Sequence, residues 1–177
     1  MKIRTLILIF AIVAVFVFSC KPPKVYPVVP QISFKELKML DGHDTLGNPV
    51  KRVVLTMSVI DGDGNIGLPD GDTLPGFDTL GNKNLFIDLW NKEGDGDFEK
   101  VNLLAPNYYK TKFLIPQGQD KSLTADYEVT MDYYFFDDYD TIKYTFYIYD
   151  RDLNRSNIGE SPAVPADTTG IFKASDD

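Results

Sequence analysis

The strongest constraint on the fold is a succession of short segments in which apolar and polar residues alternate. In 53–59 and in 142–148 every second residue is apolar. A period of two places neighbouring side chains on opposite faces of a strand, whereas an amphipathic helix needs a period of 3.6, which no segment after residue 20 sustains. Strands are therefore expected at 31–40, 50–60, 84–91, 98–104, 108–115, 123–136, 141–149 and 156–164.

The expected strands are separated by turns rich in Gly, Asn, Asp and Pro. These residues supply the backbone angles and local hydrogen bonds that turns need. About seven short strands with such turns predict an all-β fold, an antiparallel immunoglobulin-like β-sandwich over 31–166. Residues 167–177 are polar and are expected to form a flexible C-terminal tail. The segment 98–115 has two interpretations, one bent strand or two antiparallel strands.

The first 20 residues have the organisation of a secretory leader. A basic start precedes an apolar run of 13 residues at 6–18, which suits a signal core and is shorter than the ~20 residues that span a bilayer. The run ends at 17–20 in VFSC, which resembles the bacterial lipobox. The resemblance implies that 1–19 is a signal peptide and that Cys20 carries acyl chains that anchor the protein to a membrane.

Residues 20–30 would then be a lipidated cysteine followed by a Pro-rich tether. Four prolines in 21–30 favour an extended polyproline II conformation with ~3.1 Å per residue, or roughly 30 Å in all. These features predict a lipid-anchored protein of the bacterial cell envelope. Lys21 and Lys24 stand where surface-exported Bacteroidota lipoproteins often carry acidic residues, which favours the periplasmic face of the outer membrane over the cell surface.

The charge balance narrows the class of partner. The formal charge is −8, and removal of a leader that contributes Lys2 and Arg4 leaves the mature chain at −10. A nucleic-acid partner is not expected, because phosphate contacts need a basic face. The chain has one His and one Cys, which argues against a zinc cluster and against Cys–His or Ser–His catalysis. An enzyme is not expected.

An acidic loop follows the expected strand 50–60. Oxygen-bearing side chains alternate with glycines, and two more carboxylates follow. Ca²⁺ binds six to eight oxygen ligands on flexible loops, so the pattern indicates a calcium site and resembles EF-hand-type loops over 61–72. Ile66 stands where an EF-hand loop needs Gly. The alternative is a solvated turn, for which Asp, Gly and Asn are the usual residues. The candidate ligands here are Asp61, Asp63, Asn65, Asp70 and Asp72.

The same Asp-x-Asp-x-Asn spacing recurs at 150–154, just past another expected strand. If 98–115 is one bent strand, the two loops meet at the same end of the sandwich, and Asp152 and Asn154 join the first set of ligands. If 98–115 is two antiparallel strands, the loops lie at opposite ends. Taken alone, 150–154 has the composition of a turn capped by its own Asp side chain.

Aromatic residues offer a second type of site. Trp90, Tyr147 and Tyr149 are expected on the outward faces of their strands, where flat rings could stack on sugars. This would make the protein a glycan-binding lipoprotein associated with polysaccharide uptake. The alternative is that Tyr and Trp are simply common strand residues.

Three stretches, 30–34 (PQISF), 61–68 (DGDGNIGL) and 150–157 (DRDLNRSN), are similar to a group of uncharacterised Bacteroidota lipoproteins with an immunoglobulin-like domain. The resemblance implies a lipid-anchored β-sandwich and implies no activity. The expected function is therefore a binding or structural module of the cell envelope, stabilised by Ca²⁺, whose partner is an unknown envelope protein or a glycan.

Overall fold

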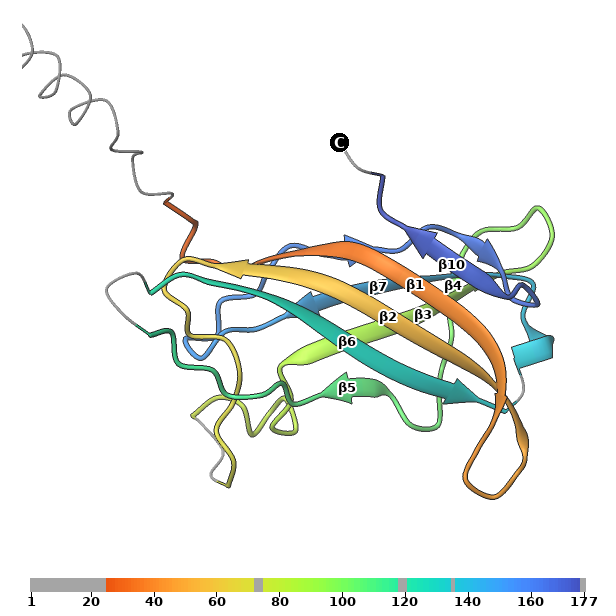
Figure 1. Ribbon diagram of the computed structural model, residues 1–177, viewed down its shortest axis with the longest axis horizontal. Coiled ribbons are helices and arrows are strands. Elements are labelled where there is room, and N and C mark those ends of the chain that lie inside the picture. Colours follow the sequence, from red (N-terminus) through yellow and green to blue (C-terminus); the bar gives the residue numbers. More distant parts are fainter. Residues whose placement is uncertain (1–24, 72–74, 118–120, 135, 176–177) are drawn as a thin grey trace, which may run out of the picture.

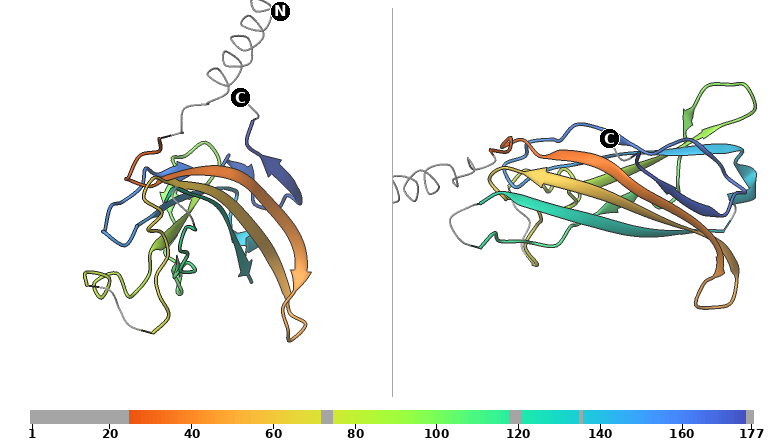
Figure 2. Two further views of the ribbon diagram at one scale, coloured as in Figure 1. Left: turned by 60° about the vertical axis from the view of Figure 1, so that its left-hand side comes forward. Right: turned by 45° about the horizontal axis from the view of Figure 1, so that its top comes forward.

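The computed structural model describes residues 25–175 apart from 72–74, 118–120 and 135 (Figure 1). The expected signal peptide, Cys20 and the first residues of the tether lie outside the described residues, and so does Asp72. The described chain is all-β and forms two antiparallel sheets that pack face to face, as the two layers in Figure 2 show.

The first sheet has the strand order β10-β1-β2-β6. Its long strands are β1 (Gln31–His43), β2 (Pro49–Asp61) and β6 (Leu123–Tyr133). A bulge interrupts the pairing of β1 with β2 between Phe34 and Glu36. The strand β10 (Gly170–Lys173) pairs with β1. The expected flexible tail at 167–177 thus contains a strand, because β1 offers it a free edge of backbone hydrogen-bonding groups.

The second sheet is centred on β3 (Leu85–Lys92) and β7 (Thr141–Ile148). The short strands β8 (Gly159–Glu160) and β9 (Val164–Pro165) pair with β7. On the other side of β3 lie β4 (Glu99–Lys100) and β5 (Asn107–Tyr109). A single turn of 3₁₀ helix, η1 (Phe136–Asp138), precedes β7.

The path of 98–115 corresponds to one interrupted strand. Both β4 and β5 are antiparallel to β3, so they run in the same direction along its edge. The two loops that follow β2 and β7 therefore lie at the same end of the molecule. A bridge between Ile66 and Asp150 and a hydrogen bond of 3.1 Å from the Arg151 N–H to the Asn65 carbonyl join them.

The core lies between the sheets and follows the alternation in the sequence. In β2 and β7 every second side chain is buried, and these side chains meet others from β1 and β3. Apolar side chains that face each other across two sheets are the main source of stability in such a fold. Among the described residues, no helix has the length and the apolar character to cross a bilayer.

Candidate cation site

The site forms at the ends of β2 and β7, where the inward-facing positions of each strand change from apolar residues to aspartates. Counting by twos from Val59 leads to Asp61, and counting by twos from Ile148 leads to Asp150. The strand period therefore carries both carboxylates into the space between the sheets. Asp61 and Asp150 are both fully buried, at 0% exposure.

A third carboxylate completes the group. Carboxylate oxygens of Asp61, Asp63 and Asp150 all lie within 4.8 Å of one another. In the loop after β2, the side chains of Asp61, Asp63 and Asn65 each have one polar atom that forms a hydrogen bond and one oxygen that is buried without a protein partner. The unpartnered oxygens are Asp61 Oδ1, Asp63 Oδ1 and Asn65 Oδ1. Buried polar atoms are normally hydrogen-bonded, so three such oxygens in one loop require an explanation.

Hydrogen bonds fix the orientation of Asn65. Its amide nitrogen donates to Asp63 Oδ2 over 3.2 Å and to Asp152 Oδ2 over 2.9 Å. The amide carbonyl must then point away from these two carboxylates. The backbone N–H of Asn65 donates to Asp61 Oδ2 over 2.8 Å, which fixes that carboxylate as well.

Asp150 is held by its own loop. Its Oδ1 accepts hydrogen bonds from the backbone N–H groups of Asp152 and Asn154, at 3.0 and 2.7 Å, and its Oδ2 accepts one from the Asn154 side chain at 2.8 Å. This is the capped turn that the composition of 150–154 suggests. Asp152 and Asn154 thus contact the site residues Asn65 and Asp150.

Close backbone contacts hold the first loop in place. Gly64 has a φ of 66°, and a Cβ atom there would lie 2.0 Å from the Lys121 carbonyl oxygen. A Cβ atom on Gly62 would lie 2.4 Å from the Tyr26 carbonyl oxygen. The glycines that alternate with the acidic residues are therefore required by packing, because the backbone of neighbouring segments lies directly against them.

The electrostatic environment disfavours the charged forms of Asp61 and Asp150. Burial, with repulsion from Asp63 as the next cause, raises the pKa of Asp61 to about 6. Burial also raises the pKa of Asp150. Taking a carboxylate out of water costs several kcal/mol unless a partner compensates. A bound cation would remove this cost and would use the unpartnered oxygens.

The other predicted ligands lie outside this group. Asp70 is exposed and is not among the gathered carboxylates, and Asp72 lies outside the described residues. Asp150 is the residue that the sequence analysis missed. The signal was present in the sequence, since Asp150 continues the buried series of its strand.

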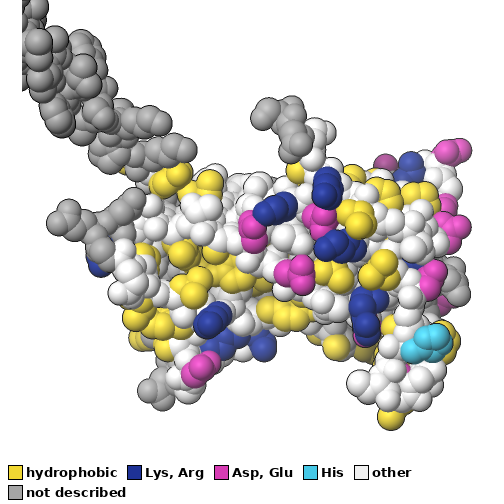
Figure 3. Space-filling view, viewed as in Figure 1, with side chains coloured by type: hydrophobic (Ala, Val, Ile, Leu, Met, Phe, Trp, Pro, Cys, Tyr) yellow, Lys and Arg dark blue, Asp and Glu magenta, His cyan; other side chains and the backbone are white. Residues whose placement is uncertain are grey.

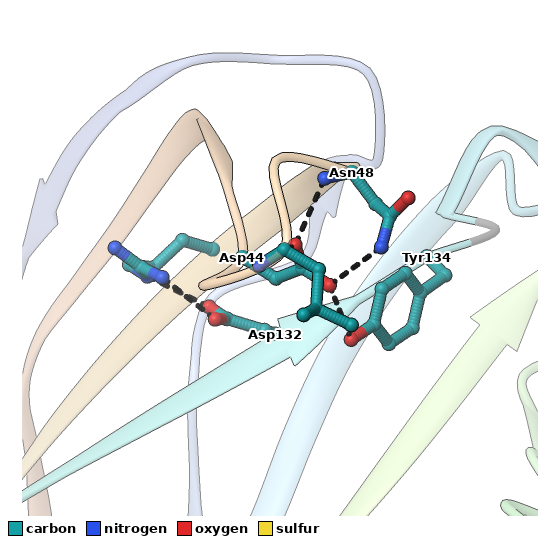
Figure 4. A network of polar contacts seen from close by, with 6 residues as sticks. Asp44, Asn48, Asp132 and Tyr134 are labelled. Carbon is teal, nitrogen blue, oxygen red and sulfur yellow. Dashed lines mark hydrogen bonds and ion pairs between the residues drawn. The ribbon is translucent and has the colours of Figure 1, made fainter.

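The molecule contains a second acidic turn, between β1 and β2, with very different chemistry (Figure 4). Asp44 Oδ1 accepts hydrogen bonds from the N–H groups of Leu46 and Asn48, both at 2.8 Å. Asp44 Oδ2 accepts them from the Asn48 side chain at 2.9 Å and from the Tyr134 hydroxyl at 3.0 Å. These donors, with Asn48 foremost, lower the pKa of Asp44 to about 2. Both oxygens have partners, so this turn needs no cation.

The predicted glycan-binding residues lie on the outward face of the second sheet. Tyr147 and Tyr149 contact each other, with ring centroids 5.9 Å apart. The Phe86 ring stacks on Tyr147 at 5.1 Å, and the Arg155 guanidinium lies 4.9 Å from the centre of the same ring. Protein groups therefore occupy much of the surface of the Tyr147 ring.

Trp90 is separate from the two tyrosines. It pairs with Lys143 in the sheet, whereas Tyr147 pairs with Phe86, four residues away along β3. At about 3.3 Å per residue, this places Trp90 roughly 13 Å from that pair. Its ring N–H donates to the Thr145 hydroxyl over 2.8 Å. The structure brings two of the three predicted residues together.

Comparison with known proteins gives no further guide: no family model, no curated protein and no solved structure matches the chain.

Proposed function

We propose that this protein is a lipid-anchored component of the bacterial cell envelope. Its two sheets form an immunoglobulin-like β-sandwich that acts as a non-catalytic binding or structural module. A calcium ion, bound between the loops that follow β2 and β7, joins the two sheets at one end. Cys20 carries the lipid, and the partner is an envelope protein or a glycan.

One observation carries the calcium proposal. Carboxylate oxygens of Asp61, Asp63 and Asp150 lie within 4.8 Å of one another, and Asp61, Asp63 and the adjoining Asn65 each have one buried oxygen without a protein partner. The remaining polar atoms of these side chains are hydrogen-bonded within the loops. The ligands are thus oriented in advance, which reduces the entropy that binding must overcome.

The donor set favours Ca²⁺ over other cations. All four side chains offer oxygen, and neither His nor Cys belongs to the gathered group, whereas zinc prefers nitrogen and sulfur. Mg²⁺ retains several waters and demands octahedral geometry, whereas Ca²⁺ accepts six to eight oxygens at flexible loops. Water molecules would supply the oxygens beyond the four side chains.

The immunoglobulin-like assignment and the anchor rest on separate features. The sheet with β1, β2 and β6 faces one with β3 and β7, and the loops after β2 and β7 share one end, as they would in an immunoglobulin-like sandwich. The basic start, the short apolar run and the VFSC sequence at 17–20 support export and lipidation.

A calorimetric titration with Ca²⁺ tests the calcium site. We expect a dissociation constant of about 10⁻³ M or lower, the range of extracellular calcium modules and tighter sites. Asp150→Asn should weaken calcium binding at least tenfold, because it removes the charge of one of the three gathered carboxylates. Asp44→Asn is the matched control and should bind Ca²⁺ as the wild type does. Absence of calcium-dependent heat or stabilisation at millimolar Ca²⁺ would overturn the site.

Metabolic labelling with an alkyne analogue of palmitate tests the anchor. We expect the wild-type protein to incorporate the label and Cys20→Ser to lose it. Unchanged labelling of Cys20→Ser would contradict lipidation at this residue.

Glycan binding is the second candidate function, and the cluster of Phe86, Tyr147 and Tyr149 on the outward face favours it. A glycan array would reveal such a ligand. If the cluster is the site, Tyr147→Ala should abolish the signal while leaving calcium binding unchanged, and a signal that survives this substitution would exclude the cluster.

A further inference from the structure

The end of the molecule that carries the cation site also carries the point where the chain leaves toward its N-terminus (Figures 1 and 2). The Gly62 N–H donates to the Pro27 carbonyl over 2.8 Å. Asn157, on the other loop, donates to the Ile32 carbonyl and accepts from the Ile32 N–H. Residues 26–32 are thus fastened to both loops of the cation site. We call this region the tether end.

Three segments surround the first loop at the tether end. Gly62 lies against Tyr26 and Pro27, Gly64 lies against Pro116 and Lys121, and Gly67 lies against Lys112. Two segments, 25–30 and the described residues of 110–122 (110–117 and 121–122), therefore flank the loop. The second loop, at 150–157, contacts it directly through Asp150 and Arg151.

Exposed apolar side chains are concentrated on these segments, and hydrophobic atoms are visible at this end in Figure 3. The side chains concerned are between 41% and 91% exposed, and all lie within the three segments or the residue that follows them. They are Val25, Val28, Val29, Ile115, Leu153 and Ile158. A concentration of exposed apolar groups in neighbouring loops marks a surface that contacts another molecule.

Leu153 adds a second argument. Its backbone has a φ of 63°, in the left-handed region that favours Gly or Asn, and its side chain is 41% exposed. The left-handed backbone is unfavourable for a leucine, and the side chain, which lies against Gly76, stays partly exposed. Such local costs persist mainly where function requires them.

The short segment between Cys20 and the described domain indicates that this surface faces the membrane. With 26–32 fastened to the domain, four residues lie between Cys20 and Val25, and the five steps from Cys20 to Val25 span roughly 18 Å when fully extended. A lipid on Cys20 therefore holds the tether end beside the bilayer. Lys112 and Lys121 are exposed on the flanking segment, and basic groups of this kind are attracted to anionic headgroups.

We propose that the tether end is a bilayer-docking surface, whose exposed apolar side chains enter the headgroup region of the membrane that holds the lipid anchor. This inference rests on the proposed lipid anchor. It fixes the orientation of the domain, with the β1–β2 hairpin directed away from the membrane and available to a partner. Calcium in the cation site would support docking, since it neutralises acidic groups that repel anionic lipids.

Fluorescence quenching in reconstituted vesicles tests the proposal. The lipidated protein is placed in vesicles of phosphatidylcholine and phosphatidylglycerol that contain a nitroxide-labelled lipid. Ile115→Cys supplies a labelling site at the tether end, and Leu46→Cys, in the β1–β2 hairpin and 85% exposed, is the matched control. Lipidation blocks Cys20, so each variant has one reactive thiol. We expect at least twofold quenching of a fluorophore at position 115 and none at position 46.

The outcomes separate the two proposals. Proteins that float with the vesicles but show equal, negligible quenching at both positions would overturn docking and leave the anchor intact. If the protein does not incorporate palmitate, the same two labels are placed in Cys20→Ser, so that each variant again has one thiol; quenching at position 115 alone would then support docking, while the missing palmitate overturns the anchor. Failure to float at all would overturn both.

Discussion

Two acidic turns of this molecule are built from the same residue types and reach opposite chemical states. The turn at Asp44 and the loop at Asp61 both combine Asp, Gly and Asn, and both follow long strands of the same sheet. Around Asp44, four hydrogen bonds reach the two carboxylate oxygens. Around Asp61, one oxygen accepts a backbone hydrogen bond and the other is buried without a protein partner.

The pKa values express this difference. Donors around Asp44 stabilise its charged form and lower its pKa to about 2. Burial and the neighbouring carboxylate of Asp63 destabilise the charged form of Asp61 and raise its pKa to about 6. The comparison shows that two conditions make an acidic turn a candidate cation site. Its carboxylates occupy inward-facing positions of the strand series, and too few hydrogen-bond donors lie near them to satisfy all their oxygens. Composition alone does not distinguish the two turns.

The largest expected effect separates the two turns by packing. Gly47 and Gly64 both have positive φ values, 87° and 66°, but a Cβ atom on Gly47 has no neighbour within 4 Å, whereas one on Gly64 lies 2.0 Å from a backbone oxygen. Gly47→Ala should destabilise the protein by about 1–2 kcal/mol, the cost of a left-handed alanine. Gly64→Ala should cost clearly more, because the neighbouring backbone must move. Urea unfolding measures both, and equal losses would contradict the packing of the cation loop.

The second effect concerns calcium itself. A ligand at one hundred times its Kd stabilises a protein by about 2.7 kcal/mol, which raises the Tm of a domain of this size by roughly 5–10 °C. Asp61→Asn should abolish this gain. Without calcium the same variant should be more stable than the wild type, because it removes a buried charge whose second oxygen has no protein partner.

Asp44→Asn provides the contrast in the same thermal melts. It should lower the Tm by the same amount with calcium and with a chelator, since Asp44 serves only its own turn. A calcium response that disappears in Asp44→Asn and survives in Asp61→Asn would reverse the assignment of the two turns.

Most of the fold was predictable from alternation, because buried and exposed positions in β2 and β7 follow the period of two residue by residue. The strand β10 was not predictable, since 170–173 is short and its pairing depends on the free edge of β1. The strands β4 and β5 are shorter than the expected strands 98–104 and 108–115, because each is limited to the residues that pair with β3. Local composition does not determine which distant edge a short segment meets.

The candidate site was predictable in part for the same reason. The spacing of Asp61, Asp63 and Asn65 pointed to the first loop. Within 150–154, the spacing pointed to Asp152 and Asn154, whereas the carboxylate that joins the group is Asp150. Strand parity would have selected Asp150, because position 150 continues the inward series of β7. A motif gives the type of ligand, and the geometry of the strand decides which residue reaches the site.

The third effect is a difference in pH dependence between the two turns, measured without calcium. The pKa of Asp61 is raised from 3.8 to about 6, so the folded state holds this proton more tightly and stability falls as the pH rises from about 4 to 6. The pKa of Asp44 is lowered from 3.8 to about 2, so its contribution is present above pH 4 and is lost as the pH falls toward 2.

Unfolding free energies over this pH range should separate the two contributions. Asp61→Asn should flatten the profile between pH 4 and 6, and Asp44→Asn should flatten it between pH 2 and 4. Calcium affinity should also fall about tenfold between pH 7 and 5, because protons compete for Asp61. An affinity that is constant from pH 7 to 5 would mean that Asp61 is not a ligand.

The smallest expected effect concerns the hydrogen bonds of Asp44. Four donors surround its carboxylate, which implies that the loss of one donor leaves both oxygens with a partner. The Tyr134 hydroxyl donates one of these hydrogen bonds from an exposed side chain. Tyr134→Phe should therefore lower the Tm by roughly 2 °C or less, because the three donors from Leu46 and Asn48 still satisfy both oxygens. The pKa of Asp44, followed by NMR, should rise slightly and stay below 3.8, since the Asn48 contacts are the larger cause of its shift. Calcium binding by the Asp44 turn in Tyr134→Phe would contradict this comparison. The number of hydrogen-bond donors would then be enough to decide which turn binds a cation, and the inward position of Asp61 and Asp150 would not be needed.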